Sequence, residues 1–393
     1  MSATPSFQLG PLETRHEAPC AEALAVSFAT SVEAMPAWWE MAGRENLRAV
    51  TLGEDWQACL LQIPMGQWFG GRSVPMIGVA GVAVPPENRG TGVATWMMRQ
   101  FIQEKHREQW PISTLYPSTW SLYRRAGYEI AGSYFRYTLR LRDLPLQPRK
   151  PSLRPFQPED QTGLEAAYRK RAKHRNGFLD RGSYVWQRVR EHRGKPRHGF
   201  LLDNGKDIQG SIFYYQIQKP DFFWNMELSD FTATSAESAC RMLSFLAQHQ
   251  TMGGEVEFFS GPHEPMLDLL AHRVFESQLF EYWMVRMVHL PKAMESRGWP
   301  LGLKTDLQFQ IEDDLIGENN GTFRLQISGG EGRWTAGGEG RIQISAPNLA
   351  PLYTGFHSAT SLAQHGRLQA SPEDLALLDA AFAGPPPGMA DMF

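Results

Sequence analysis

Two glycines lie where a strand-like run meets a helix-like run, in VAVPPENRGTGVATWMM at residues 82–98. The first N–H groups of a helix have no backbone partner and carry the positive end of the helix dipole, so a helix start attracts anions. Gly90 and Gly92 would let the backbone approach such an anion closely, and Arg89 would add positive charge. We expect a pyrophosphate here, although the spacing also fits a tight turn that binds nothing. The pattern matches neither a P-loop nor a full GxGxxG fingerprint.

Aromatic rings and carboxylates gather in SFATSVEAMPAWWEM at residues 27–41, an expected helix and loop. Such a mixture can hold a cationic amine by charge and by cation–π contact. The candidates are Phe28, Glu33, Trp38, Trp39 and Glu40, with Trp68 and Phe69 added from an expected loop beside a strand. Core packing is the alternative for each aromatic ring.

The remaining chemistry-bearing residue types are scattered. Cys20, Cys59 and Cys240 form no CxxC pair, and His263, His357 and His365 have no metal-ligand spacing. We therefore predict no metal site and no disulfide framework.

Composition excludes several classes of protein. With 39 basic and 42 acidic residues in 393, the formal net charge is −3, which does not favour binding to nucleic acid. The N-terminus lacks the features of a signal peptide, and no apolar run is long enough to span a bilayer. We expect a cytoplasmic protein without membrane contact.

The chain divides into three expected segments, at residues 1–147, 148–285 and 286–393. The first boundary follows from LRDLPLQPRKPSLRPFQPED (141–160), where five prolines in 20 residues disfavour helices and strand pairing. In the second segment we expect a helix over 158–173 and a hairpin turn at Asp203, Asn204 and Gly205. The third is expected to be mostly strands until a last helix capped by Ser371. Its apolar alternations are Leu307, Phe309 and Ile311; Phe323, Leu325 and Ile327; and Ile342 and Ile344.

The first two segments share a faint repeat in which a buried strand leads through a short loop into a helix. The first copy is residues 78–84 followed by an amphipathic helix with Val93, Met97 and Phe101 on one face. The second is residues 226–231 followed by a helix for which Thr234 and Glu237 form an expected capping box. The second loop, TATSAES, contains no glycine. We therefore expect only the first segment to bind a phosphate-bearing ligand.

Residues 82–94 resemble the acetyl-CoA loop of the GCN5-related N-acetyltransferases. An expected strand ends in V-x-V, a proline follows, and RGTGVA then opens a helix. Further along, LYRRAGY resembles the short helix of that family, which carries a tyrosine shortly before a Gly-aromatic pair. The three-segment layout, with LAPLYTGFHSATSLAQHGRL and a terminal phenylalanine, resembles the enhanced intracellular survival family of amine acetyltransferases. The resemblance implies an α+β fold of two tandem mixed-sheet acetyltransferase domains, the second degenerate, followed by a sterol-carrier-like domain.

The resemblance also implies how the site is built. The loop would hold the acetyl-CoA co-substrate through Val82, Ala83, Val84, Arg89, Gly90, Thr91, Gly92, Val93 and Ala94. The backbone near Val84 would also face the developing oxyanion. Tyr123 is our candidate for the general acid, because a phenol with a pKa near 10 stays protonated at pH 7. Tyr128 is its rival, although we expect it to pack in the sheet.

In the family that it resembles, the C-terminal carboxylate is thought to reach the active site, which gives the role of general base to Phe393. A frayed chain end is the alternative. The resemblance further implies a homo-oligomer, of which a hexamer is one form.

The leading interpretation is an N-acetyltransferase that acts on primary amines of polycationic small molecules, such as aminoglycosides or polyamines, or on lysine side chains. One alternative is a non-catalytic sensor that binds acyl-CoA or a lipid. Another is an acyl carrier that uses the last segment as a lipid pocket.

Overall fold

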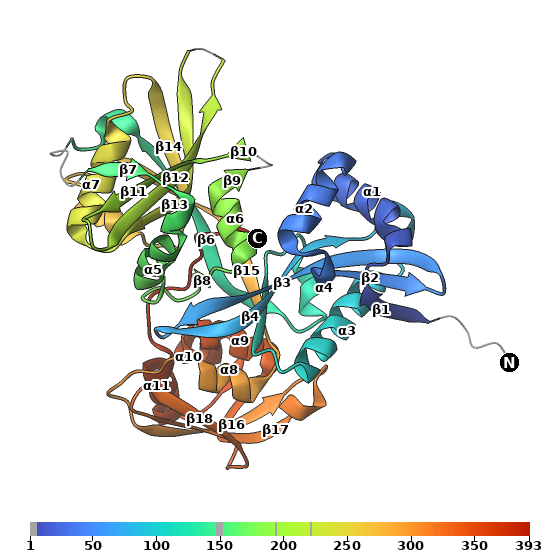
Figure 1. Cartoon of the computed structure of the whole chain (residues 1–393). Helices are drawn as coiled ribbons and strands as arrows, with labels where there is room; N and C mark the ends of the chain where they lie inside the picture. Colours follow the sequence, from blue (N-terminus) through green and yellow to red (C-terminus); the bar gives the residue numbers. More distant parts are fainter. Residues whose placement is uncertain (1–5, 147–151, 193–194, 221) are drawn as a thin grey trace.

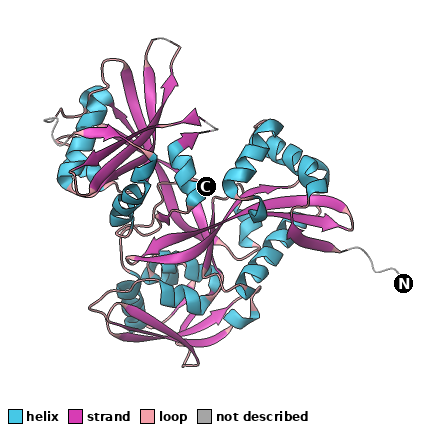
Figure 2. Ribbon diagram, in the orientation of Figure 1, coloured by secondary structure: helices cyan, strands magenta, loops and turns pink. Residues whose placement is uncertain are grey.

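Strands from the first two segments pair in one continuous mixed sheet, which Figure 1 shows running through the middle of the molecule. The computed structural model describes residues 6–146, 152–192, 195–220 and 222–393. The expected boundary at residues 147 and 148 lies outside these ranges. Helices cover the faces of the sheet, and a smaller separate sheet forms the lower part of the view (Figure 2).

The first part of the chain supplies one half of the large sheet. Its strands are β1 (Phe7–Pro11), β2 (Leu47–Leu52), β3 (Asp55–Phe69), β4 (Arg72–Ala83), β5 (Ile112–Leu115) and β6 (Glu129–Arg140). Its helices are α1 (Glu17–Phe28), α2 (Met35–Ala42), α3 (Val93–Arg107) and α4 (Trp120–Arg124). As the periodicity predicts, α3 turns Val93, Met97 and Phe101 into the core, where each is at most 1% exposed.

The second part supplies the other half. Its strands are β7 (Leu153–Pro155), β8 (Leu179–Asp180), β9 (Glu191–His192), β10 (Lys195–Pro196), β11 (His198–Asp203), β12 (Ile208–Gln218), β13 (Trp224–Ala233), β14 (Gly253–Ser260) and β15 (Phe275–Met287). Its helices are α5 (Gln161–Ala172), α6 (Ser183–Arg190) and α7 (Ala236–Ala247). The expected helix and the hairpin between β11 and β12 are confirmed. The expected capping box is wrong, because α7 begins one residue later and is capped by Ser235 with Ser238.

The two halves are joined by β15, which lies between β5 and β6. On one side it pairs antiparallel with β5, from Met284 opposite Leu115 to Met287 opposite Ile112. On the other side it pairs along almost the whole of β6. A strand from the second part of the chain therefore completes the sheet of the first part.

The third part forms a five-stranded sheet in the order β18, β17, β16, β19, β20. Its strands are β16 (Thr305–Glu312), β17 (Gly321–Ser328), β18 (Glu331–Ala336), β19 (Ile342–Ser345) and β20 (Leu368–Gln369). Its helices are α8 (Leu290–Ser296), α9 (Ala346–Thr354), α10 (Ala359–Gln364) and α11 (Pro372–Phe382). The alternating strands and the cap at Ser371 are confirmed, and the structure adds three short helices, α8, α9 and α10, before the last one. Ser345 caps the start of α9, which contains prolines, and Ser358 caps the start of the short helix α10.

The chain does not end beside α11. Figure 1 shows the red tail rising from the third part to a C-terminus that lies beside the large sheet. Along the way the N–H of Ser133 donates to the carbonyl of Pro387 (3.3 Å), and the N–H of Gly388 donates to the carbonyl of Asn176 (3.0 Å). The last residues are therefore held by backbone bonds to both halves of the sheet.

One cross-strand pair makes the junction between the halves sensitive to side-chain size. Trp283 on β15 lies opposite Gly132 on β6 and is fully buried. A Cβ atom placed on Gly132 would lie 1.9 Å from Cζ2 of that indole ring. The ring therefore occupies the space that any other side chain at position 132 would need.

We predict that Gly132→Ala lowers the free energy of unfolding by about 1–3 kcal/mol, the usual cost of overpacking a core. Gly10→Ala is the matched control, since Gly10 is also in a strand and its Cβ would meet nothing within 4 Å. Thermal unfolding of both variants checks the prediction. Equal midpoints would contradict it.

Candidate active site

The glycine loop between β4 and α3 is an exposed turn with a bare helix start. Gly90 and Gly92 have φ values of 81° and 88°, a left-handed conformation that favours glycine, and a Cβ on either would meet nothing within 4 Å. Gly92 is the N-cap residue and offers no side chain as a cap, while Oγ1 of Thr91 accepts a long hydrogen bond from the N–H of Val93 (3.5 Å). Arg89 is exposed, and its Nε donates to the carbonyl of Val84 (3.2 Å). The loop can therefore present backbone N–H groups and one cation to an anion.

Strand β4 parts from its neighbour just before this loop. Its parallel pairing with β5 ends at Val79 opposite Leu115, but β4 itself continues to Ala83. Gly81 has a φ of 55°, and the register with β3 shifts there, which marks a β-bulge. Beyond Val79 one edge of β4 is therefore left for an extended ligand, because an unpaired strand edge presents both N–H and C=O groups. The candidate contacts Val82 and Ala83 lie on this stretch, and Val84 directly follows it.

The two tyrosines of the LYRRAGY stretch have different surroundings. Tyr123 lies on α4 and is 3% exposed, and burial raises the pKa of its phenol above the ordinary value. Tyr128 is fully buried, and its hydroxyl is hydrogen-bonded to the Ser113 hydroxyl at 2.7 Å. Burial raises the pKa of Tyr128 as well. The Tyr128 hydroxyl is therefore engaged inside the sheet, as expected.

The last residue lies over β4. Phe393 is only 8% exposed, and its ring lies 5.8 Å from that of Tyr116, the residue directly after β5. A Cβ on Gly78 would come within 2.7 Å of the Phe393 ring, so the ring packs on the bare backbone of β4. The end of the chain is therefore packed where β4 and β5 begin to separate, and it is not a frayed tail.

The aromatic candidates divide into two groups. Trp38 is half-buried: its ring packs on the bulge at Gly81, and its Nε1 donates to the Tyr184 hydroxyl (2.9 Å). Phe28 is 53% exposed and meets Trp38 edge-on, while Glu33 is exposed nearby. Trp39 is 2% exposed and packs in the core. Phe28 and Trp38 therefore remain beside the site, whereas Trp39 has little surface for a ligand.

Trp68 and Phe69 are not in a loop, so this expectation is wrong. They are the last residues of β3, which extends far enough to pair with β8. Trp68 is 7% exposed and packs in the second part, and Phe69 is fully buried against Tyr353 of α9.

Sequence reasoning missed the polar residues that surround the tail. The Tyr116 hydroxyl donates to the carbonyl of Asp391 (2.8 Å), and the Asp391 carboxylate pairs with Arg181. Tyr134 stacks on Phe259 at 4.6 Å, and burial raises the pKa values of both Tyr116 and Tyr134. Tyr116 could have been found from its place directly after a strand. The others come from distant parts of the chain and carry no local signal.

Comparison with known proteins identifies the three parts. Acetyltransferase (GNAT) domain models match residues 11–131 and 177–287, and a sterol carrier protein domain model matches residues 290–390. A GCN5-related N-acetyltransferase from Anabaena variabilis superposes with a TM-score of 0.94 at 30% identity, covering 99% of this chain and 100% of that one. The chain belongs to the GCN5-related N-acetyltransferases.

Two further relatives have similar extents. The N-acetyltransferase Eis of Mycobacterium tuberculosis is 25% identical over 335 residues, which is 80% of this chain and 79% of that protein. A GCN5-related N-acetyltransferase from Kribbella flavida has a TM-score of 0.87 at 25% identity and covers 99% of both chains. This acetyltransferase is thus an Eis-like member with two acetyltransferase domains and a sterol carrier protein domain.

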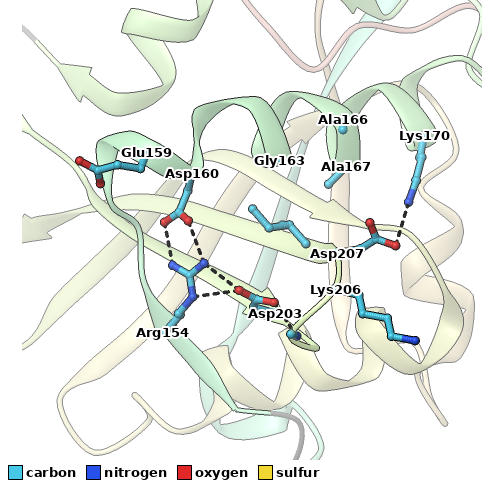
Figure 3. A pocket seen from close by; sticks show the side chains of 12 residues that line it. Arg154, Glu159, Asp160, Gly163, Ala166, Ala167, Lys170, Asp203, Lys206 and Asp207 are labelled. Atoms are coloured by element: carbon cyan, nitrogen blue, oxygen red, sulfur yellow. Dashed lines mark hydrogen bonds and ion pairs between the residues drawn. The ribbon is translucent and has the colours of Figure 1, made fainter.

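A separate surface pocket of the acetyltransferase lies on its second part, between α5 and the hairpin turn (Figure 3). Its volume is about 280 Å³, and five of its charged side chains form ion pairs within the pocket. Arg154 lies between the carboxylates of Asp160 and Asp203, at 2.7 Å from each, and Lys170 lies 3.8 Å from Asp207. The pocket shares none of its lining residues with the loop or the tail.

The described ranges contain no group of His, Cys, Asp and Glu side chains that could hold a metal ion. Nor do they contain a helix that is both long and apolar enough to cross a membrane.

The raised pKa of Tyr123 predicts a pH dependence of stability. Above pH about 10 the phenol ionises in the unfolded chain but stays protonated in the folded one. Stability that is present at lower pH is therefore lost as the pH rises, by up to about 1.4 kcal/mol per pH unit. Tyr123→Phe removes this contribution, so the wild type should lose stability relative to the variant only above pH about 10. Denaturant unfolding of both proteins across this pH checks it, and parallel curves would contradict it.

Proposed function

We propose that this acetyltransferase transfers the acetyl group of acetyl-CoA to a primary amine of a polycationic small molecule or of a lysine side chain. The observation that carries the proposal is the position of the last residue, packed on β4 where β4 and β5 part. In this proposal, a chain end buried at that point would bring its carboxylate to the place where a thioester meets its acceptor.

The coenzyme would bind along the separated edge of β4 and the start of α3. Backbone N–H groups from Arg89 to Ala94 would hold the pyrophosphate, since Gly90 and Gly92 leave space for a close approach and the N-cap residue of α3 has no side-chain cap. Of these groups, the N–H of Arg89 already donates to the carbonyl of Pro86 (3.3 Å) and that of Val93 to Oγ1 of Thr91 (3.5 Å). The edge at Val82, Ala83 and Val84 would pair with the extended thioester arm, and the N–H of Val84 would stabilise the oxyanion. The loop of the second part has no glycine, so we assign no coenzyme to it.

The reaction needs a base for the amine and an acid for the thiolate. The acceptor attacks the thioester carbonyl as the neutral amine, and the terminal carboxylate of Phe393 would accept the proton that this nitrogen loses as the new C–N bond forms. When the C–S bond breaks, the phenol of Tyr123 would donate its proton to the leaving thiolate. Burial keeps that phenol protonated, because it raises the pKa.

The acceptor would lie between the first and second parts. Phe28 and Trp38 offer aromatic faces beside the bulge, Glu33 offers negative charge, and Tyr184 of α6 closes the second side. Aminoglycosides, polyamines and lysine peptides all present a primary ammonium group to such a surface. We also propose that the protein assembles into homo-oligomers.

The third part serves, we propose, as the scaffold that delivers the tail. Its core holds the fully buried guanidinium of Arg297 among Trp299, Tyr353 and Phe382, each ring within 4.9 Å. This filled interior favours a scaffold over the lipid-carrier alternative.

Thiol release from acetyl-CoA, measured with a disulfide dye across polyamines, aminoglycosides and lysine peptides, tests the proposal. Release that depends on the amine is expected, and it also identifies the acceptor class. Coenzyme binding without release from any amine would favour the sensor alternative instead.

Tyr123→Phe should lower turnover by about 10²–10⁴-fold, the usual share of general acid–base catalysis. Because the phenol acts on the thiolate and not on the pyrophosphate, the affinity for acetyl-CoA should stay unchanged. Steady-state kinetics with calorimetric binding measures both quantities, and Tyr128→Phe is the comparison variant. Nearly full turnover in Tyr123→Phe would end this assignment.

Removal of Met392 and Phe393 should abolish turnover and leave coenzyme affinity intact, because the carboxylate would then end two residues short of the site. Retained turnover in this truncated chain would refute the assignment of the base. The thermal unfolding midpoint of the truncated chain serves as its folding control.

A further inference from the structure

Asp391 lies two residues before the chain end and is bound by side chains from both halves of the sheet. Its carbonyl accepts a hydrogen bond from the Tyr116 hydroxyl of the first part (2.8 Å). Its carboxylate receives two contacts from Arg181 of the second part, from Nε to Oδ2 (3.0 Å) and from Nη2 to Oδ1 (2.9 Å). A two-pronged arginine–carboxylate pair fixes both distance and orientation.

The arginine is itself held in place by the second part. The Arg181 side chain is 1% exposed, and its guanidinium lies 3.8 Å from the Tyr168 ring centre and 4.8 Å from that of Trp186. Its Nη1 donates to Asp230 (2.8 Å), whose other oxygen accepts from Ser211. The guanidinium therefore has a fixed place that does not depend on the tail.

The buried positive charge of Arg181 favours the tail in its bound position. A guanidinium so fully removed from water is costly unless every N–H finds a partner. Asp230 satisfies one side of Arg181, and Asp391 supplies acceptors on the other. Release of the tail would leave Nε and Nη2 without the partners that they have in the structure.

The grip limits where the terminal carboxylate can go. Two residues span at most about 7 Å when extended. With Asp391 fixed and the Phe393 ring packed against Tyr116, the carboxylate is confined to the region above β4. Small displacements of a reacting group lower turnover strongly.

We propose that Arg181 and Asp391 form a latch whose function is to position the terminal carboxylate for proton transfer. Both are positioning residues, since they act through Phe393. This inference rests on the proposed role of the terminal carboxylate as the base.

Asp391→Ala opens the latch and leaves Arg181 paired one-to-one with Asp230, so the chain retains a balanced ion pair in its core. We expect kcat to fall about 100-fold. The KM for acetyl-CoA should stay unchanged, because neither residue lines the glycine loop. A merely structural defect would lower stability and affect both constants.

Asp160→Ala is the matched control. Asp160 is also one of two carboxylates on a single arginine in the second part, but it lies at the surface pocket of Figure 3, which the tail does not line. This control should keep the kcat of the wild type.

Digestion with a carboxypeptidase, followed by mass spectrometry of the intact chain, tests the latch without any need for catalysis. The buried Phe393 of the wild type should resist removal, and Asp391→Ala should lose it faster. If Asp391→Ala does not fold, Tyr116→Phe takes its place in the test. It removes only the hydroxyl that holds the Asp391 carbonyl, and it should also lose Phe393 faster than the wild type does.

Two results would overturn the inference: an unchanged rate of Phe393 removal, or faster removal with an unchanged kcat. Absence of amine-dependent release in the wild type would instead refute the proposed function, and the digestion would still report on the latch.

Discussion

The insertion of β15 between β5 and β6 is the constraint on which the rest of the structure depends. Backbone hydrogen bonds on both edges of this strand make one sheet out of two acetyltransferase halves. The junction closes because Gly132 leaves room for the Trp283 ring, whose Nε1 donates to the carbonyl of Ser133 (3.2 Å). The two halves are thereby fixed relative to each other, and a site built from both can keep its geometry.

The same strand ties the third part to the sheet. Arg286 of β15 is fully buried and forms two hydrogen bonds with Asp313, at 2.6 and 2.7 Å. Its guanidinium also lies against Gly127, which has a φ of 81° and no room for a Cβ. The turn after Tyr123 is therefore built around an ion pair that links β15 with the third part, and the environment of the candidate acid depends on all three parts.

The tail brings Phe393, the proposed base, to the sheet from the far end of the chain. It leaves the third part, bonds to Asn176 and Ser133, and ends against Tyr116 and β4. Buried ion pairs are costly to desolvate, and the two-carboxylate arrangement at Arg181 is most readily explained as a device for orientation. The role proposed for the sterol carrier protein domain, as the scaffold from which the tail begins, needs no lipid.

Much of the fold could be predicted because it depends on local rules. Apolar alternation gave the strands of the third part, the Asp-Asn-Gly turn gave the hairpin, and 3.6-residue periodicity gave α3. The glycine loop could also be predicted, because backbone positions with positive φ angles favour glycine. Two of the errors were local as well, whereas Trp68 and Phe69 were misplaced because β3 extends to pair with the distant β8. The cap of α7 shifted by one residue to Ser235, and short proline-containing helices in the third part do not show a clear period.

The sequence by itself determined α3, the hairpin, the alternating strands of the third part, the glycine loop and the family, because each depends on residues close together in the chain. Only the tertiary structure decided which aromatic rings face the site: Trp38 lies at the Gly81 bulge, whereas its neighbour Trp39 is in the core. It alone also decided that Asp391 meets Arg181 and Tyr116, which are 210 and 275 positions away. Contacts between residues so far apart in the chain form only when the whole sheet is assembled. Their free energy depends on many distant residues at once, so no short stretch of sequence predicts them.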